Sequence, residues 1–141
     1  MNEKISTEEK LMSLLSHLSM LIPNIGILAP IIIWINQKDK SKFVKFNALQ
    51  AIFFQLVFLA IMMLSMFIGI ILMLISLPLI TSNPDAELGT LFFVSMIFMF
   101  LYFPFWFAFA IYAVVASVKS FKGKVFRYAI IGKIIEKRIY K

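Results

Sequence analysis

The segment INQKDKSKFVKFNALQAIFFQ, residues 35–55, places a short basic loop between two long apolar runs. Nothing charged lies between Lys10 and this loop, or between the loop and Asp85. Long charge-free runs on both sides of a basic loop are typical of a helical membrane protein, whose loops stay outside the hydrocarbon. The charged residues of the loop are Lys38, Asp39, Lys40, Lys42 and Lys45.

The composition of the whole chain leads to the same class. Of its 141 residues, 62% are hydrophobic and 15% are charged, and the mean hydropathy is +0.95. Soluble domains average about 45–50% apolar and about 25% charged residues, whereas a membrane-spanning helix needs about 20 apolar residues in a row. We therefore predict an all-α integral membrane protein, a small bundle of four helical segments followed by a C-terminal amphipathic helix.

The charges of the chain are distributed unevenly, and this predicts its topology. Residues 37–46 carry four lysines against one acid, and residues 119–141 carry eight Lys or Arg against one Glu. The charged residues of positions 81–87 are both acids, Asp85 and Glu87. Because Lys and Arg mark cytoplasmic loops, we expect the basic loop and the C-terminus to be cytoplasmic and residues 81–87 to lie outside. The net charge of +7 then indicates anionic lipid headgroups of a bacterial plasma membrane rather than nucleic acid.

The N-terminal region, residues 7–36, predicts a broken helical structure. Ser6 and Glu9 form a capping-box pattern, and His17 lies opposite the leucine face of the helix that follows. Pro23 and Gly26 then interrupt the helix. Two threadings fit: one broken span with the N-terminus outside, or a hairpin of short or tilted helices with the N-terminus inside. The position of the turn favours the hairpin.

Two long apolar runs predict two transmembrane helices, at residues 47–80 and 88–118. Pro78 is expected to end the first helix, and Pro104 to kink the second. Small residues spaced along helices allow close helix packing in lipid. The candidates for helix packing are Ser65, Gly69, Ser76, Ala113 and Ser117.

The basic tail, residues 119–141, predicts an amphipathic helix after a break at Gly123. An apolar line lies beside basic residues, which is typical of a helix at the surface of an anionic leaflet. The apolar line consists of Tyr128, Ile131, Ile135 and Ile139.

Several short motifs resemble a known family. They are His17-Leu18-Ser19, Pro23, Ala29-Pro30, Trp34, the Lys-Asp-Lys-Ser loop, Phe46-Asn47-Ala48, and Gly123 with Arg127-Tyr128. In this order, over residues 12–134, they resemble the small bacterial membrane proteins related to the chloroplast Tic-twenty translocon component. The family usually has Pro at position 129 and often His at position 47, where this chain has Ala and Asn. The resemblance implies a four-helix protein with both ends on one side, as the hairpin requires.

Polar residues near the cytoplasmic ends of the helices form the candidate functional cluster. His17 is the only histidine, and the spans contain no ionisable residue, so we expect no catalytic site, metal or cofactor. The function we expect is non-enzymatic: an accessory or structural subunit that packs against a membrane-protein partner or itself, with the lysine loop as docking or headgroup-binding site. The alternative is a conduit or carrier for a polypeptide, lipid or small solute. The cluster consists of His17, Asn24, Asn47, Gln50 and Gln55.

Overall fold

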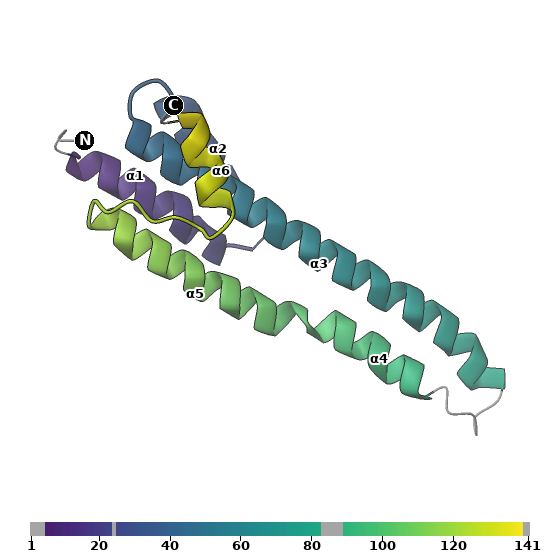
Figure 1. Ribbon diagram of the computed structural model, residues 1–141. Coiled ribbons are helices and arrows are strands. Elements are labelled where there is room, and N and C mark those ends of the chain that lie inside the picture. The colour runs from purple at the N-terminus through teal and green to yellow at the C-terminus, as the bar shows by residue number, and fades with distance from the viewer. Residues whose placement is uncertain (1–4, 24, 83–88, 140–141) are drawn as a thin grey trace. The chain divides into compact units, whose positions relative to one another are not determined.

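The computed structural model of the chain describes residues 5–23, 25–82 and 89–139, and for residues 79–82 it describes the backbone alone. Figure 1 shows the helices of the described chain, and this chain forms two compact units. Unit 1 comprises Met1–Val57 and Phe109–Lys141, and unit 2 comprises Phe58–Ala108. The regular elements of the described residues are all helical: α1 Thr7–Leu18, the 3-10 helix η1 Ser19–Leu21, α2 Leu28–Gln37, α3 Lys42–Ser82, α4 Gly89–Phe100, α5 Tyr102–Phe121 and α6 Ile131–Ile139.

The all-helical prediction is confirmed, but the predicted number of helices is wrong. The run expected as one helix at residues 88–118 is divided at Leu101 into α4 and α5. Pro104 explains the break, because proline has no N–H to donate and its ring displaces the carbonyl four residues earlier. That carbonyl belongs to Phe100, where α4 ends. The proline therefore interrupts the helix one turn before its own position.

The helix α3 is longer at both ends than the predicted helix at residues 47–80. Ser41 caps its start, since the Ser41 hydroxyl accepts a hydrogen bond from the Val44 N–H at 3.2 Å. The basic loop is correspondingly shorter than predicted, and Lys42 already lies on the helix. Pro78 lies inside α3 and does not end it. With 41 residues, α3 is about 60 Å long, twice the thickness of a bilayer core.

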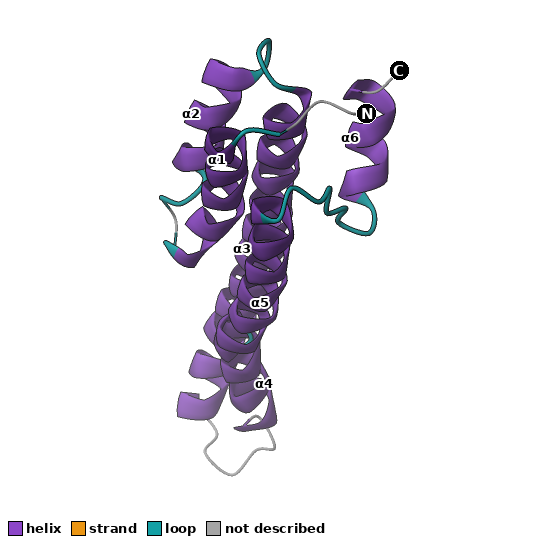
Figure 2. Cartoon of the chain, turned by 90° about the vertical axis from the view of Figure 1, so that its left-hand side faces the viewer, coloured by secondary structure: helices purple, strands orange, loops and turns teal. Residues whose placement is uncertain are grey.

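The N-terminal helices α1 and α2 pack against each other, and the chain reverses direction between them (Figure 2). The capping box predicted for α1 is present, with Ser6 and Glu9 exchanging two hydrogen bonds. Gly26 is required at the reversal, because an added Cβ would lie 2.0 Å from the Ser19 carbonyl oxygen. The two helices are therefore held as a tight hairpin.

Unit 2 contains the later part of α3, α4 and the start of α5. The Ser65 hydroxyl donates to the Phe98 carbonyl at 2.9 Å, which joins α3 to α4. An added Cβ on Gly69 would lie 3.1 Å from the side chain of Met99, so the two helices approach closely at this glycine. Two stretches of the described residues, Lys42–Pro78 and Gly89–Phe121, are long and apolar enough to cross a membrane.

Candidate functional site

A buried hydrogen-bond network in unit 1 is centred on His17. The His17 side chain is 1% exposed, and its Nε2 lies 3.2 Å from Oδ1 of Asn47, which is fully buried on α3. The polar face of α1 points inward: Ser13, Ser16 and His17 are buried, whereas Leu11 and Leu15 are exposed. The polar and apolar faces of α1 are thus reversed relative to a surface helix of a water-soluble protein, which buries its apolar face.

Asn47 orients the histidine. Its Nδ2 donates to the Phe43 carbonyl at 2.9 Å, so its Oδ1 must point to the other side. That oxygen also accepts a hydrogen bond from the Ser120 hydroxyl of α5 at 2.9 Å. Because Oδ1 can only accept, His17 carries its proton on Nε2 and donates it to Asn47. The network therefore joins α1, α3 and α5.

Tyr128, which precedes α6, completes the network from the other side. Its hydroxyl lies 3.1 Å from Nδ1 of His17, and this nitrogen accepts because the proton is on Nε2. The Tyr128 ring stacks on Phe54 with centroids 4.1 Å apart, and it lies 5.2 Å from the ring of Tyr112. The Tyr128 side chain is 2% exposed. Tyr128 is therefore the anchor of the C-terminal arm, which we define as residues 124–139.

Gln50 holds the backbone of the same arm. Its Nε2 donates to the Phe126 carbonyl at 2.9 Å, and its Oε1 accepts from the Tyr128 N–H at 3.0 Å. An added Cβ on Gly132 would lie 2.7 Å from this Oε1, so glycine is needed for the start of α6 to approach. One amide side chain of α3 thus satisfies two backbone groups of the arm.

Gln55 lies one turn beyond this group and makes a separate contact. Its Nε2 donates to the Ser19 hydroxyl at 3.3 Å, and that hydroxyl donates to the Ser16 carbonyl at 2.9 Å. The structure thus joins His17 and Asn47 directly, while Gln50 and Gln55 bind other parts of unit 1. Asn24, the remaining member of the predicted cluster, lies outside the described residues.

Burial controls the protonation of this network. Burial lowers the pKa of His17 to about 4, and the hydrogen bond to Asn47 opposes this shift only in part. Burial also raises the pKa of Tyr128 above its usual value, and a further increase comes from Tyr112. At neutral pH the network therefore consists of a neutral imidazole between a phenol and an amide. Within the described ranges, no three His, Cys, Asp or Glu side chains are close enough to share a metal ion.

Three members of the network are not in the predicted cluster. Tyr128 is predicted as part of an apolar line facing lipid, Ser19 is named only within a family motif, and Ser120 is not named in the sequence analysis. For Ser120, the available signal was the spacing of small residues on α5, since its buried residues follow each other at intervals of one or three positions. They are Ala110, Ala113, Ala116, Ser117 and Ser120.

The apolar line of the tail does not face lipid as predicted. Tyr128 and Ile135 are buried in the protein, whereas Ile130 and Ile134 are 74% and 58% exposed. The reason is the pair of hydrogen bonds that Gln50 makes with the arm. They hold Gly132 against α3, so the face of α6 that contains Gly132 packs on α3. The exposed face of α6 therefore carries Ile134 beside Lys133, Lys137 and Arg138, and the exposed Ile130 lies in the turn before the helix.

The predicted helix-packing residues lie in both units. Ala113 and Ser117 are 1% and 2% exposed within unit 1, and Ser76 is fully buried. Ser76 and Ser117 donate to carbonyls of their own helices, at 3.0 and 2.8 Å. Ser65 differs from these two serines, because its hydroxyl donates to a carbonyl of a second helix, that of Phe98 on α4.

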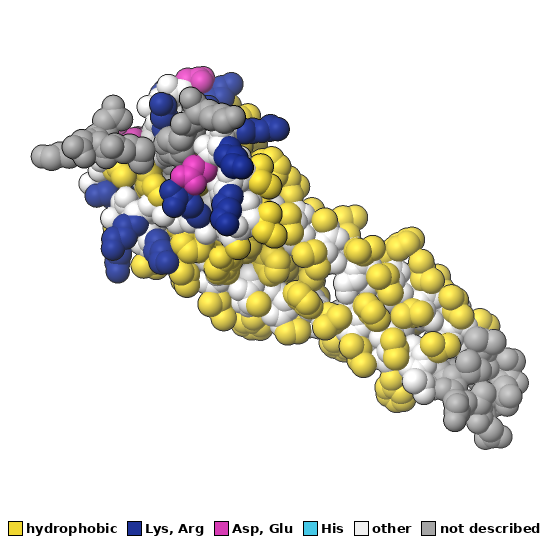
Figure 3. Space-filling view, in the orientation of Figure 1, with side chains coloured by type: hydrophobic (Ala, Val, Ile, Leu, Met, Phe, Trp, Pro, Cys, Tyr) yellow, Lys and Arg dark blue, Asp and Glu magenta, His cyan; other side chains and the backbone are white. Residues whose placement is uncertain are grey.

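All charged side chains of the described chain lie in unit 1 (Figure 3). They comprise twelve Lys and Arg and four Asp and Glu. The predicted docking loop is part of this set, and its residues Lys38, Asp39 and Lys40 are exposed. In the C-terminal arm, Arg127 forms a salt bridge with Glu136. Residues 58–82 and 89–108 of unit 2 contain no charged residue.

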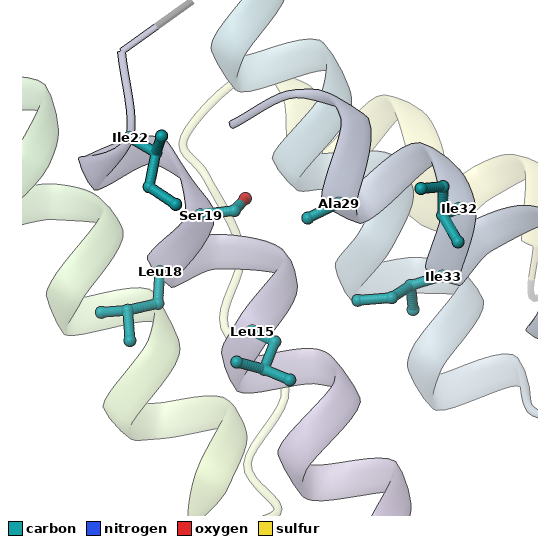
Figure 4. Close-up of a pocket in the computed structure, with 7 residues that line it drawn as sticks. All are labelled: Leu15, Leu18, Ser19, Ile22, Ala29, Ile32 and Ile33. Atoms are coloured by element: carbon teal, nitrogen blue, oxygen red, sulfur yellow. The ribbon is translucent and has the colours of Figure 1, made fainter. Parts of the chain in front are cut away.

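An open apolar groove lies between α1 and α2, on one side of unit 1 (Figure 4). Its volume is about 440 Å³. Ser19 contributes the only hydroxyl among the side chains that line it. The lining residues are Leu15, Leu18, Ser19, Ile22, Ala29, Ile32 and Ile33.

Comparison with known proteins identifies the family. Residues 8–135 match the sequence profile of the magnetosome magnetite crystal formation protein family. The chain belongs to this family. The match covers both long apolar helices and the whole buried network, and it is consistent with a membrane protein. Neither the curated proteins nor the solved structures contain a match to the chain.

This match also corrects the family resemblance drawn from the sequence. The assignment to relatives of the Tic-twenty translocon component is wrong, because the profile that matches belongs to the magnetosome family. The motifs behind the resemblance are short, and two of them serve the internal packing of this fold. Gly123 ends α5 with a positive φ of 70°, and Asn47 orients His17.

Proposed function

We propose that this protein is a non-enzymatic accessory subunit of a bacterial membrane assembly, and that it supports crystal formation as the description of its family implies. Unit 2 crosses the bilayer, and unit 1 stands at the cytoplasmic surface. The partner is a second membrane protein or another copy of the chain, bound through the apolar helices and the basic face.

The observation that carries the proposal is the partition of charge. The described residues of unit 1 carry twelve basic side chains, and those of unit 2 carry none. Burying one Lys or Arg at the bilayer centre costs about 2.5–3.5 kcal/mol, whereas near an anionic surface each contributes about 1 kcal/mol of attraction. The partition therefore supports a protein anchored by unit 2 and held at the cytoplasmic leaflet by unit 1.

The buried network supports an accessory role rather than a conduit. The polar residues that a conduit would place at its cytoplasmic mouth are 0–7% exposed: His17, Asn47, Gln50 and Gln55. Each of them is hydrogen-bonded to another part of unit 1. Polar groups of this kind fix the packing of helices in a protein where apolar contacts alone are not selective.

Co-purification from native membranes in mild detergent tests the accessory role. We expect a stoichiometric membrane-protein partner or a discrete homo-oligomer, which Gly69→Leu weakens because it widens the α3–α4 contact. Leu64→Ile is the matched control, since Leu64 is 61% exposed on the same helix. A strictly monomeric protein without a partner would contradict the proposal.

A further inference from the structure

We propose that the groove between α1 and α2 binds one acyl chain of an anionic phospholipid, whose headgroup is held by the lysines between α2 and α3. This inference rests on the proposed location of unit 1 at the cytoplasmic leaflet. It assigns a defined lipid site to a surface that would otherwise contact only bulk lipid.

The dimensions of the hairpin fit one leaflet. With 12 and 10 residues, α1 and α2 are about 18 and 15 Å long, whereas the full hydrocarbon core is about 30 Å thick. Neither helix can cross the membrane alone. The helices are about as long as the hydrocarbon of one leaflet is thick, so one acyl chain can lie along the groove between them.

The groove itself has the chemistry of an acyl-chain site. Its volume of about 440 Å³ lies in the range of about 300–1,000 Å³ that is usual for small-molecule pockets. Leu15 and Ile22 on one side and Ile32 on the other are 51–59% exposed, so these side chains remain open to an apolar occupant. The single hydroxyl, that of Ser19, is already bonded to the Ser16 carbonyl.

Charge at the end of α2 identifies the headgroup. Lys38 lies with its ammonium group 5.9 Å from the ring centre of Trp34, which directly follows the groove residue Ile33. A tryptophan beside a lysine is typical of the membrane–water interface. Lys38 is five residues beyond Ile33, or about 7.5 Å along the helix.

The loop supplies more than one cation at this level. Lys38, Lys40 and Lys42 are exposed and outnumber the one acid, Asp39. A phospholipid with its chain against Ile32 and Ile33 would therefore place its phosphate near several lysines. An anionic headgroup should be preferred over a zwitterionic one, because only the anionic lipid keeps a net negative charge beside them.

Native mass spectrometry of the full-length protein in mild detergent tests the site. With phosphatidylglycerol and phosphatidylcholine offered at equal concentration, we expect one tightly retained phosphatidylglycerol per chain. Ala29→Phe should fill the groove and weaken this retention about tenfold, a loss of about 1.4 kcal/mol, whereas the matched variant Leu64→Phe on unit 2 should not change it. The proposal would be overturned if both variants retained phosphatidylglycerol equally well. It would also be overturned if the wild-type protein retained phosphatidylcholine as tightly as phosphatidylglycerol.

The headgroup and the location need separate readouts. The double variant Lys38→Gln/Lys40→Gln should lose the preference for phosphatidylglycerol, and an unchanged preference would contradict the assignment of the headgroup. With wild-type protein, phosphatidylglycerol carrying a diazirine on its acyl chain should cross-link mainly to residues 15–33. Cross-links spread evenly along α3 would show annular lipid only, and they would leave the accessory role of the protein untouched.

Discussion

The two units differ in where they place polar and apolar side chains. Unit 1 buries polar side chains and carries every charge of the described chain, whereas the described residues of unit 2 are uncharged and expose large apolar side chains. The helix α3 belongs to both units and changes character along its length: Asn47 and Gln50 are fully buried near its start, and Met63, Leu64 and Phe67 are 61–65% exposed further on. Polar contacts specify the packing of unit 1, and close backbone approach specifies that of unit 2.

This difference shows which interactions determine the helix packing of each unit. In unit 1, directional hydrogen bonds select one arrangement of α1, α5 and the C-terminal arm around α3. In unit 2, Gly69 allows close contact with α4 through its small size, and Ser65 adds one hydrogen bond to the Phe98 carbonyl. Mutations should therefore have different signatures in the two units.

The largest effect should come from removing the anchor of the C-terminal arm. Tyr128→Ala deletes a buried ring that stacks on Phe54 and a hydroxyl that donates to His17. We expect a loss of about 3–5 kcal/mol of stability in unit 1, measured by thermal unfolding in detergent, and rapid proteolysis after Lys124. Tyr128→Phe keeps the ring and should lose only about 1 kcal/mol. Similar losses in the two variants would show that the hydroxyl, not the ring, anchors the arm.

A smaller loss should follow from Gln50→Leu, which tests whether one amide side chain holds the arm. The change leaves the Phe126 carbonyl and the Tyr128 N–H without their partner. Two unsatisfied buried groups should cost about 2–4 kcal/mol, with faster amide hydrogen exchange at residues 126–132.

Gln55→Leu is the matched control, because Gln55 makes one hydrogen bond to a side chain and none to the arm. Exchange in residues 126–132 should remain as slow as in the wild type. If both variants accelerate exchange in the arm equally, the clamp assigned to Gln50 is wrong.

The stability of unit 2 should depend mainly on the size of the side chains at the α3–α4 contact. Gly69→Leu places a large side chain where a Cβ is already 3.1 Å from Met99. Overpacking of this kind costs about 1–3 kcal/mol, and it should lower the temperature of aggregation in detergent while leaving exchange in the arm unchanged. A comparable effect of Leu64→Ile would argue against a specific α3–α4 contact.

The smallest effect concerns pH and separates the units by chemistry. Since burial lowers the pKa of His17 to about 4, the unfolded chain binds a proton more readily than the folded one. Stability should therefore be complete above about pH 6.5 and should decrease as the pH falls toward 4, by about 1 kcal/mol between pH 7 and 5.5.

Thermal unfolding between pH 7 and 5 would measure this dependence. A His17→Asn variant should show a flatter profile, because the titrating group is gone. An identical slope in the variant would assign the pH dependence to other groups.

The sequence predicts the helical class and the two long apolar runs, because these depend on local composition and period, and it names His17, Asn47, Gln50 and Gln55 as polar candidates. Long-range partners could not be predicted. His17 and Tyr128 are 111 positions apart, and nothing in the local pattern pairs them. For the same reason the apolar line of the tail, which includes Ile135, is predicted to face lipid: its periodicity is correct, but the contacts of Gln50 decide which surface it covers.

The family could not be predicted correctly for a related reason. Motifs such as Phe46-Asn47-Ala48 and Gly123 are short and reflect helix packing and helix ends, which many small membrane proteins share. The break at Leu101 is predicted only as a kink at Pro104. Its exact position depends on the carbonyl that the proline ring displaces, which lies four residues earlier.

Cysteine accessibility in intact cells tests the central claim, that unit 1 stands at the cytoplasmic surface while unit 2 crosses the membrane. The chain has no native cysteine, so single cysteines at Asn2, Lys40, Asp85 and Lys137 can each be probed with a membrane-impermeant maleimide. We expect labelling from outside at Asp85 only, and labelling of the other three positions after the cells are permeabilised. Labelling of Lys40 or Lys137 from outside would contradict the account.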